Sequence, residues 1–495
     1  MPPPAKTPTG LWLLIALLAL GAGGKAILHD TLDPDCFWHL RVADQLCHDG
    51  VRSLVDGISF ASVKEPWTPY SWLAELGMKA LWDAGGYRAA ILAQAAMSAL
   101  FVLAIALIAR TGETHRRGDA ARVSALAVVI ATAFAAFLCM AYLSFRPATL
   151  AILLLSFCYL LLQRDAGKNQ QTRSIWLIVP LTALLANIHL YVFLVPLWLA
   201  AILIGERLAG RSTRRLVFLL LATSLASLAT PMLPGMIRTL LHYQFNDPMV
   251  AGPAISEMQP FWRGAMGQIS AVGVLGFFVA IVLRRRQFGV ADWLLLIGST
   301  LLLLIHGRYA PLFAIVAAPL LARMLPTFSS APLARPLLVR ALAAILLVGV
   351  ARLSFAFPSK STNVSQWLNR HGPDAPGYPA SAADFIETRL PARTGRLINE
   401  FTWGGYLAWR LGDRYQVLLD GRTQLFSSHF WQATYLGTPV ELQTYLSSVP
   451  ADAALLPAGH SRFRYALLKL GWQTVYNDDR AEVLIPPAAL STLGF

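Results

Sequence analysis

Two aspartates separated by a proline follow the first hydrophobic segment, within the stretch DTLDPDCFWHLRVADQL (residues 30–46). Pro34 fixes its own backbone and favours an extended conformation at Asp33, so both carboxylates are held before the next helix begins. A carboxylate near apolar surface can gain proton affinity and act as a general base. Asp33 and Asp35 are therefore candidate catalytic residues. They could equally bind a divalent cation that neutralises a phosphate leaving group, and Asp35 could instead be the N-cap of the helix.

A second set of polar residues lies at the ends of hydrophobic segments, and its members are all basic. Each one alone is explained by a side chain that reaches the membrane interface. Together, on one membrane face, they would form a site for an anionic, lipid-linked phosphate. This set contains Arg146, His189, His306 and Arg308.

The stretch NEFTWGGYL combines an acid, three aromatic residues and two glycines where a strand is expected to run into a helix. Backbone N–H groups of Gly404 and Gly405 at a helix N-terminus suit an anion, although the glycines could instead form a tight turn that packs strand against helix. Glu400 and Trp403 are candidate acceptor-binding residues beside them. The first loop adds His39, Arg41 and Glu75 as further candidates for substrate binding.

The stretch LLDGRTQLF places Asp420 and Arg422 directly after an apolar strand. An acid and a base at the carboxyl end of a strand commonly line a site in open α/β sheets, which makes both residues candidates for acceptor binding. The alternative is that Asp420 and Arg422 pair with each other and fix the loop.

The composition indicates the kind of protein that must position these residues. The chain has 495 residues, of which 56% are hydrophobic and only 14% are charged, with a net charge of +14. Its apolar residues occur in long runs, so it is expected to be an integral membrane protein. The basic residues fall in short loops between these runs, which is typical of positive-inside topology and argues against a nucleic-acid partner.

About 20 apolar residues cross a bilayer, and the sequence predicts an α-helical polytopic membrane protein with about eleven such helices. With eleven spans, all the basic loops fall on the cytoplasmic side, whereas residues 29–86 and everything after 357 fall outside the cytoplasm. The predicted spans are 10–28, 87–109, 121–143, 147–163, 174–189, 191–206, 215–231, 269–283, 290–305, 309–325 and 338–356. The long stretch 174–206 is divided at the polar NIH, residues 187–189.

Two regions are expected outside the membrane. Within the transmembrane domain, residues 1–356, the first loop at 29–86 contains two amphipathic helices, CFWHLRVADQL and YSWLAELGMKALWDAGG. Residues 357–495 are expected to begin with a linker and to form an α/β domain, because strand and helix patterns alternate there. Cys36 and Cys47 could form a disulfide only if the segment between them is not one straight helix.

The loop segments DPDCFWHLRVADQL, DGISF and WLAELGMKALW, with FTWGGYLAWRL and LLDGRTQLF near the end, are similar to a bacterial family of multi-span proteins. A first span followed by an Asp-bearing loop with amphipathic helices resembles the GT-C glycosyltransferase superfamily, which includes protein O-mannosyltransferases, aminoarabinose transferases of lipid A and oligosaccharyltransferases. The resemblance covers nearly the whole chain. Asp-Pro-Asp stands in place of the Asp-Glu pair of the O-mannosyltransferase loop, and the aromatic-rich Asp motif of oligosaccharyltransferases is missing.

The resemblance implies a polyprenyl-phosphate sugar donor and a glycan, lipid or protein acceptor activated by Asp33 or Asp35, with inverting displacement. It implies that Arg146, His189, His306 and Arg308 hold the donor phosphate. It also implies a bacterial inner-membrane protein whose C-terminal domain faces the periplasm. The competing hypotheses are a non-catalytic scaffold in envelope polysaccharide assembly and a transporter of lipid-linked saccharides. The sequence carries no Walker A loop, nicotinamide fingerprint, zinc-ligand spacing or serine nucleophile elbow.

Overall fold

The computed structural model describes residues 9–28, 32–111, 125–168, 170–245, 247–251, 255–325, 377–390, 395–459 and 461–493. The chain divides into two compact units. The helical unit comprises Met1–His29, Ile91–Thr230 and Ser256–Asn363, and the mixed unit comprises Asp30–Ala90, Pro231–Ile255 and Val364–Phe495. The mixed unit is therefore assembled from three separate stretches of chain. The predicted division between residues 1–356 and 357–495 stays a prediction.

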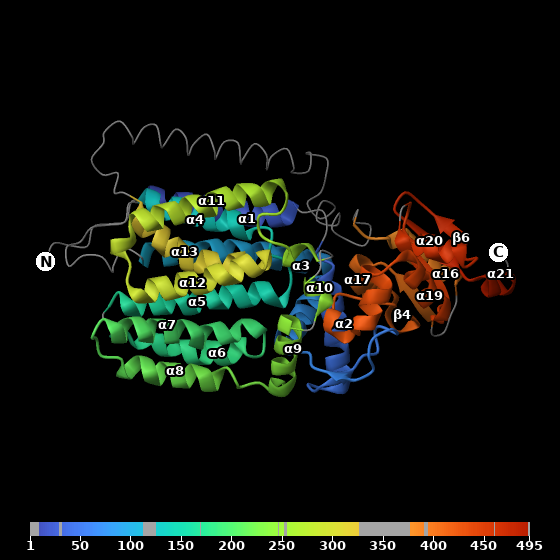
Figure 1. The fold of residues 1–495 in the computed structure, drawn as a ribbon, viewed down its shortest axis with the longest axis horizontal. Coiled ribbons are helices and arrows are strands. Elements are labelled where there is room, and N and C mark those ends of the chain that lie inside the picture. Colours follow the sequence, from blue (N-terminus) through green and yellow to red (C-terminus); the bar gives the residue numbers. More distant parts are fainter. Residues whose placement is uncertain are drawn as a thin grey trace. The chain divides into compact units, whose positions relative to one another are not determined.

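The helical unit is built from apolar helices that lie side by side (Figure 1). Helix α13 is at its centre, because every residue of its span is buried and it packs against α4, α5, α11 and α12. The helices are α1 (Thr9–Leu28), the second half of α3 (Trp72–Thr111), α4 (Ala125–Cys139), α5 (Pro147–Ala166), α6 (Ile178–Leu185), α7 (Leu194–Leu208), α8 (Arg214–Ala226), α11 (Gly264–Leu283), α12 (Val290–Ile305) and α13 (Ala310–Met324). Short 3-10 turns η1 (Arg173–Leu177), η2 (Leu190–Phe193), η4 (Arg285–Gln287) and η5 (Gly307–Tyr309) lie between them.

The outer helices expose large apolar side chains. Leu225 and Val272 are each 71% exposed, and Leu283 is 78% exposed. Four of the described helices are long and apolar enough to cross a membrane: Trp72–Thr111, Pro147–Ala166, Leu190–Leu208 and Gly264–Leu283. Helices that are apolar on their outer faces as well as inside suit a lipid environment rather than water.

Each predicted span that the structure describes contains an apolar helix, although α4 ends at Cys139 and α8 at Ala226, before the predicted ends of their spans. The division at residues 187–189 is confirmed, because α6 ends at Leu185 and η2 begins at Leu190. The predicted span 338–356 and most of the basic loop 110–122 and of the linker after 357 lie outside the described residues. The count of eleven spans therefore stays a prediction. The region 232–268, expected to be a loop, contains the helices α9 (Leu233–Phe245) and α10 (Pro248–Ala251) and the 3-10 turn η3 (Ser256–Met258).

A five-stranded sheet forms the core of the mixed unit, in the order β4-β3-β5-β7-β6. Strand β3 is parallel to β4 and β5, whereas β7 is antiparallel to β5 and β6. The strands are β3 (Gly395–Asn399), β4 (Tyr415–Val417), β5 (Ala453–Pro457), β6 (Gln473–Asn477) and β7 (Ala481–Ile485). The helices around them are α16 (Ala380–Arg389), α17 (Gly404–Leu411), α18 (Ser428–Trp431), α19 (Pro439–Ser448), α20 (Arg462–Lys469) and α21 (Pro487–Leu493), with the π-helical turn η9 (Gln432–Leu436). The alternation of strands and helices predicted for this region is therefore present in the structure.

The first loop belongs to the same unit as this sheet. It contains α2 (Asp35–Asp49), the short antiparallel strands β1 (Leu54–Val55) and β2 (Pro66–Trp67), and the first half of α3. Residues 58–60 lie parallel to β4 at the edge of the sheet. Phe60 N donates to Val417 O at 2.9 Å, and Val417 N donates to Ile58 O at 3.1 Å. The loop thus covers one of the sheet's exposed edges.

An aromatic cluster fills the space between α2, the first half of α3 and α17. Phe37 is at its centre and is fully buried, with five ring centroids 5.2–6.0 Å from its own. Its partners are Trp82, Tyr87, Tyr378, Tyr406 and Trp409. Rings in these edge-on and tilted arrangements contribute both buried area and specific geometry. Both segments of the loop that were expected to be helical lie in helices, α2 and the first half of α3, and aromatic side chains of both pack into this cluster.

Candidate functional site

Within the helical unit, two predicted basic residues meet at one carboxylate. Arg146 is the N-cap of α5, and Arg308 lies in the turn between α12 and α13. Arg146 Nη2 is 2.7 Å from Glu257 Oε2, and Arg308 Nη1 is 3.6 Å from Glu257 Oε1. Residues far apart in the sequence thus place two guanidinium groups at one point.

Glu257 was not predicted as a site residue. It lies in η3, in a region without hydrophobic periodicity, and no sequence signal pointed to it. Burial alone would raise the pKa of Glu257, but the charges of Arg146 and Arg308 outweigh it and lower the pKa to about 2. Glu257 is therefore ionised, and its carboxylate offsets one of the two positive charges.

The two predicted histidines lie in the same group and contribute hydrogen bonds. His306 Nδ1 donates to Met258 O at 2.7 Å. His189 is the N-cap of η2, and its Nδ1 accepts from Tyr191 N at 3.3 Å. The structure therefore brings both histidines together with Arg146 and Arg308.

A glycine positions Arg308. Gly307 N donates to Gln259 O at 2.9 Å, and a Cβ at Gly307 would lie 2.5 Å from Tyr142 Oη and 3.0 Å from Gln259 O. Any larger residue would push η5 away from the segment that carries Glu257. We define Arg146, His189, Glu257, His306 and Arg308 as the basic cluster.

In the mixed unit, the two predicted aspartates open α2. Pro34 is the N-cap and Asp35 is the first helical residue, so the alternative that Asp35 caps the helix is wrong. The carboxylate of Asp33 lies just before the N-cap, and its Oδ1 accepts a hydrogen bond from Asp35 N, the first amide of the helix, at 3.0 Å. Among the described residues, no group of three or more His, Cys, Asp and Glu side chains could hold a metal ion. A divalent cation at Asp33 and Asp35 stays a prediction.

His39 and Glu75 form a buried pair that joins α2 to the first half of α3. His39 Nδ1 is 2.9 Å from Glu75 Oε1, and the two residues are 6% and 1% exposed. Arg41 lies on the same helix and pairs with Asp413 and, at 3.9 Å, with Asp44. These contacts fasten the loop helices to one another and to the α/β region.

Glu400 lies at the carboxyl end of β3, where its carboxylate accepts two hydrogen bonds. Ser461 Oγ donates at 2.6 Å and Tyr435 Oη donates at 3.1 Å. Trp403 Nε1 donates to Gly377 O at 3.1 Å. Glu400 is thus at the edge of the sheet where open α/β sheets bind ligands.

Gly404 and Gly405 allow close packing at the start of α17. A Cβ at Gly404 would overlap Leu419 O, and one at Gly405 would lie 2.8 Å from Pro34 O and 3.3 Å from Trp38 N. The packing alternative considered for these glycines is therefore present in the structure. Gly405 brings α17 against the first turn of α2, beside the two aspartates.

Asp420 and Arg422 are fully buried and pair with each other, as one of the two alternatives predicted. Arg422 Nε lies 2.9 Å from Asp420 Oδ1, and Nη2 lies 2.5 Å from Asp420 Oδ2. Arg422 Nη2 is also 2.9 Å from Asp56 Oδ1 in the first loop. Asp56 was not predicted as a partner, although it belongs to the DGISF segment that contributed to the resemblance.

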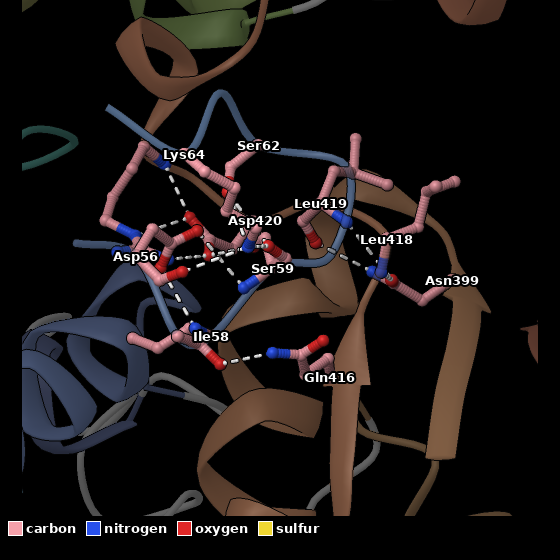
Figure 2. A network of polar contacts seen from close by, with 12 residues as sticks. Asp56, Ile58, Ser59, Ser62, Lys64, Asn399, Gln416, Leu418, Leu419 and Asp420 are labelled. Atoms are coloured by element: carbon pink, nitrogen blue, oxygen red, sulfur yellow. Dashed lines mark hydrogen bonds and ion pairs between the residues drawn. The ribbon is translucent and has the colours of Figure 1, made fainter. Parts of the chain in front are cut away.

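Figure 2 shows the same polar network around Asp420. Ser59 Oγ donates to Asp420 Oδ2 at 2.8 Å, and Ile58 N donates to Asp56 Oδ1 at 3.0 Å. Lys64 Nζ donates to Ser59 O at 2.6 Å and to Asp56 O at 3.0 Å. Asn399 adds a link within the sheet, because its side chain binds the backbone of Leu418 and Leu419.

Comparison with solved structures shows that the chain shares its fold with ArnT and with the archaeal oligosaccharyltransferase AglB. ArnT from Cupriavidus metallidurans in the apo state is 13% identical, with a TM-score of 0.52 over 97% of this chain and 99% of that one. The same protein bound to undecaprenyl phosphate gives a TM-score of 0.50. The archaeal oligosaccharyltransferase AglB from Archaeoglobus fulgidus, in complex with an inhibitory peptide and a dolichol-phosphate, is 12% identical, with a TM-score of 0.54 over 91% of this chain and 70% of that one. No protein-family model and no curated protein sequence matches the chain.

Proposed function

We propose that the protein is a membrane glycosyltransferase that moves a sugar from a polyprenyl-phosphate carrier to a glycan, lipid or protein acceptor. The observation that carries the proposal is the convergence of Arg146 and Arg308 on one point in the helical unit. The fold supports it, because two solved structures with this fold contain undecaprenyl phosphate and dolichol-phosphate. We place the protein in the bacterial inner membrane with its C-terminal domain in the periplasm.

The donor phosphate binds at the basic cluster in this proposal. Two planar guanidinium groups match the oxygen atoms of a phosphate and hold it in a defined orientation. Negative charge grows on the phosphate oxygen as the bond to the sugar breaks. Charged donors that are already in place stabilise that oxygen more than they stabilise the intact donor, which lowers the barrier.

The acceptor is activated by the aspartates at the start of α2. Asp33 or Asp35 takes the proton of an acceptor hydroxyl, the acceptor oxygen forms a bond to the anomeric carbon, and the bond from that carbon to the phosphate oxygen breaks. The lipid phosphate leaves with the electron pair, and the configuration at the anomeric carbon inverts. Glu400 and Trp403 contact the acceptor in this proposal, on the ligand-binding edge of the sheet.

Transfer of a labelled sugar tests the proposal. Purified protein in nanodiscs would be incubated with radiolabelled undecaprenyl-phosphate sugars and a cell-envelope acceptor fraction. Wild type would be compared with Asp33→Asn, Asp35→Asn, Arg146→Gln and Arg308→Gln. We expect transfer by wild type and a loss of about 10²-fold or more in both arginine variants and in at least one aspartate variant.

The matched control is Arg211→Gln. Arg211 also pairs with a glutamate, Glu206 at 2.9 Å, but its side chain is 67% exposed and lies outside the basic cluster. Full activity is expected in this variant. The proposal fails if no donor is used by folded wild-type protein, or if Arg146→Gln and Arg308→Gln transfer sugar as well as Arg211→Gln does.

A further inference from the structure

We propose that the turn at residues 420–424, sequence DGRTQ, positions the aspartates of the first loop rather than binding the acceptor. This inference rests on the proposed function, because it assigns to Asp33 and Asp35 the reaction described above. Each residue of the turn contacts a segment that comes from another part of the sequence within the mixed unit. Three kinds of contact carry the inference.

The first is a buried charge contact with the middle of the loop. Arg422 is fully buried, pairs with Asp420, and reaches Asp56 at 2.9 Å. Its guanidinium carbon lies 5.1 Å from the centroid of the Trp67 ring. The Arg422 guanidinium is thus bound by two carboxylates and packs on an aromatic ring. Separating the guanidinium from the carboxylates would leave buried charges unpaired.

The second is a steric contact with the first turn of α2. A Cβ at Gly421 would overlap Asp35 Oδ1 and would lie 2.7 Å from Trp38 Nε1. The backbone of the turn therefore touches the candidate base directly, and only glycine leaves room for the carboxylate. This contact fixes how far the Asp35 side chain can move toward the sheet.

The third is a pair of hydrogen bonds to the segment that contains α9 and α10. Thr423 Oγ1 is 2.5 Å from Asp247 Oδ2, and Tyr243 Oη is 2.6 Å from Gln424 Oε1. Asp247 and Thr423 are both buried. The turn thus contacts both the first loop and the segment that contains α9 and α10. The first loop is also held by the pairing of residues 58–60 with β4.

A positioning role and an acceptor-binding role make different kinetic predictions. If the turn only orients Asp35, disturbing it lowers kcat and leaves the KM values for donor and acceptor unchanged. A misplacement of about 1 Å can cost on the order of 10²-fold in rate. If Arg422 instead bound the acceptor, its loss would mainly raise the KM for the acceptor.

The test uses full-length protein in nanodiscs and the variant Gly421→Ala. We expect kcat to fall about 10²-fold, both KM values to stay within about twofold, and residues 32–40 to lose protection from hydrogen exchange. The control is Gly77→Ala, since a Cβ at this helical glycine meets nothing within 4 Å. That variant should keep wild-type kcat and exchange.

Arg422→Lys is a second variant in case Gly421→Ala does not fold. It keeps the buried charge but loses the fork that binds Asp420 and Asp56 together, so kcat should fall while the KM values stay unchanged. A raised KM for the acceptor with an unchanged kcat overturns the inference. Unaltered hydrogen exchange at residues 32–60 in both variants also overturns the inference. This exchange measurement still tests the contact between the turn and the first loop if wild type transfers no sugar and the proposed function has failed.

Discussion

At the residue scale, the carboxylate of Glu257 determines the charge that the basic cluster offers to a ligand. It occupies the point on which Arg146 and Arg308 converge. Its pKa is lowered from 4.5 to about 2, so the carboxylate stays charged at every pH above this range. The stability that the ionised group contributes is present above its ordinary pKa and is lost only as the pH falls toward 2. The donor phosphate that we propose to bind here would therefore compete with Glu257 for the two arginines.

The variant Glu257→Gln tests this competition. Removing one negative charge beside the phosphate should tighten the binding of undecaprenyl phosphate about tenfold, which corresponds to about 1.4 kcal/mol. Microscale thermophoresis with protein in nanodiscs would measure the Kd. Glu206→Gln, which removes the partner of the exposed Arg211, should leave the Kd unchanged. Weaker binding by Glu257→Gln would mean that this carboxylate orients the arginines and does not compete with the ligand.

A second prediction at this scale concerns Asp56. Burial opposes its ionisation, but the charge of Arg422 and hydrogen bonds from Ser62 and Ile58 lower the pKa of Asp56 below its ordinary 3.8. Because the folded-state pKa is lowered, its contribution to stability is present above about pH 4 and is lost as the pH falls further. Asp56→Ala should cost about 3–5 kcal/mol at neutral pH, since Arg422 then keeps only one of its two carboxylates.

Thermal unfolding at neutral pH would measure this loss as a lower Tm. Asp44→Ala is the control, because Asp44 pairs with Lys79 at 2.9 Å on the surface and its side chain is 38% exposed. A surface pair of this kind contributes less than about 1 kcal/mol. Equal Tm values for the two variants would show that the contact between Arg422 and Asp56 does not hold the loop.

At the element scale, the first loop and the α/β region form one core. The strands β3, β5, β6 and β7 could be predicted because each is a short apolar or β-branched run bounded by turn residues. The pairing of residues 58–60 with β4 could not, because strand pairing between distant segments leaves no local pattern. In the same way, the sequence offered the pair of Asp420 and Arg422 as one alternative but gave no sign of Asp56. Glu257 has no periodic pattern around it, and its role arises only from contacts with distant residues.

Phe37→Ala tests whether the aromatic cluster holds these elements together. Phe37 lies in α2, is fully buried and contacts five aromatic rings from other segments of the mixed unit. Its loss should therefore lower the free energy of unfolding by about 3–5 kcal/mol and lower the Tm. Hydrogen exchange should rise in α2 and α17 together. Phe137→Ala, at an apolar position of α4 that is 43% exposed, is the control. A change confined to α2 would show that α17 is held by other contacts.

At the scale of the whole molecule, hydropathy and charge predicted helices that the structure confirms, because about 20 apolar residues are needed to cross a bilayer. Sidedness follows from the distribution of basic loops, and it stays a prediction. All four cysteines lie in described residues and none of them forms a disulfide; Cys47 is exposed, whereas Cys36, Cys139 and Cys158 are buried. Cys36 and Cys47 lie on one continuous helix, α2, so the condition set for a disulfide between them is not met.

Cysteine labelling tests the predicted side of the first loop. A membrane-impermeant maleimide added to intact spheroplasts should label Cys47, because we expect residues 29–86 to face the periplasm. Cys47→Ser should abolish the labelling. If the label reaches Cys47 only after the membrane is permeabilised, the first loop is cytoplasmic and the predicted orientation is reversed.

The strand-like pairing of residues 58–60 has a practical consequence for anyone who wants a soluble fragment. A fragment of residues 377–493 alone would lack residues 58–60, which pair with β4. It would also lack Phe37, which packs against Tyr378, Tyr406 and Trp409. A bare strand edge beside an open apolar surface invites self-association. A fragment that stays monomeric in water would have to include the first loop as well, joined by a linker that replaces the apolar helices between them.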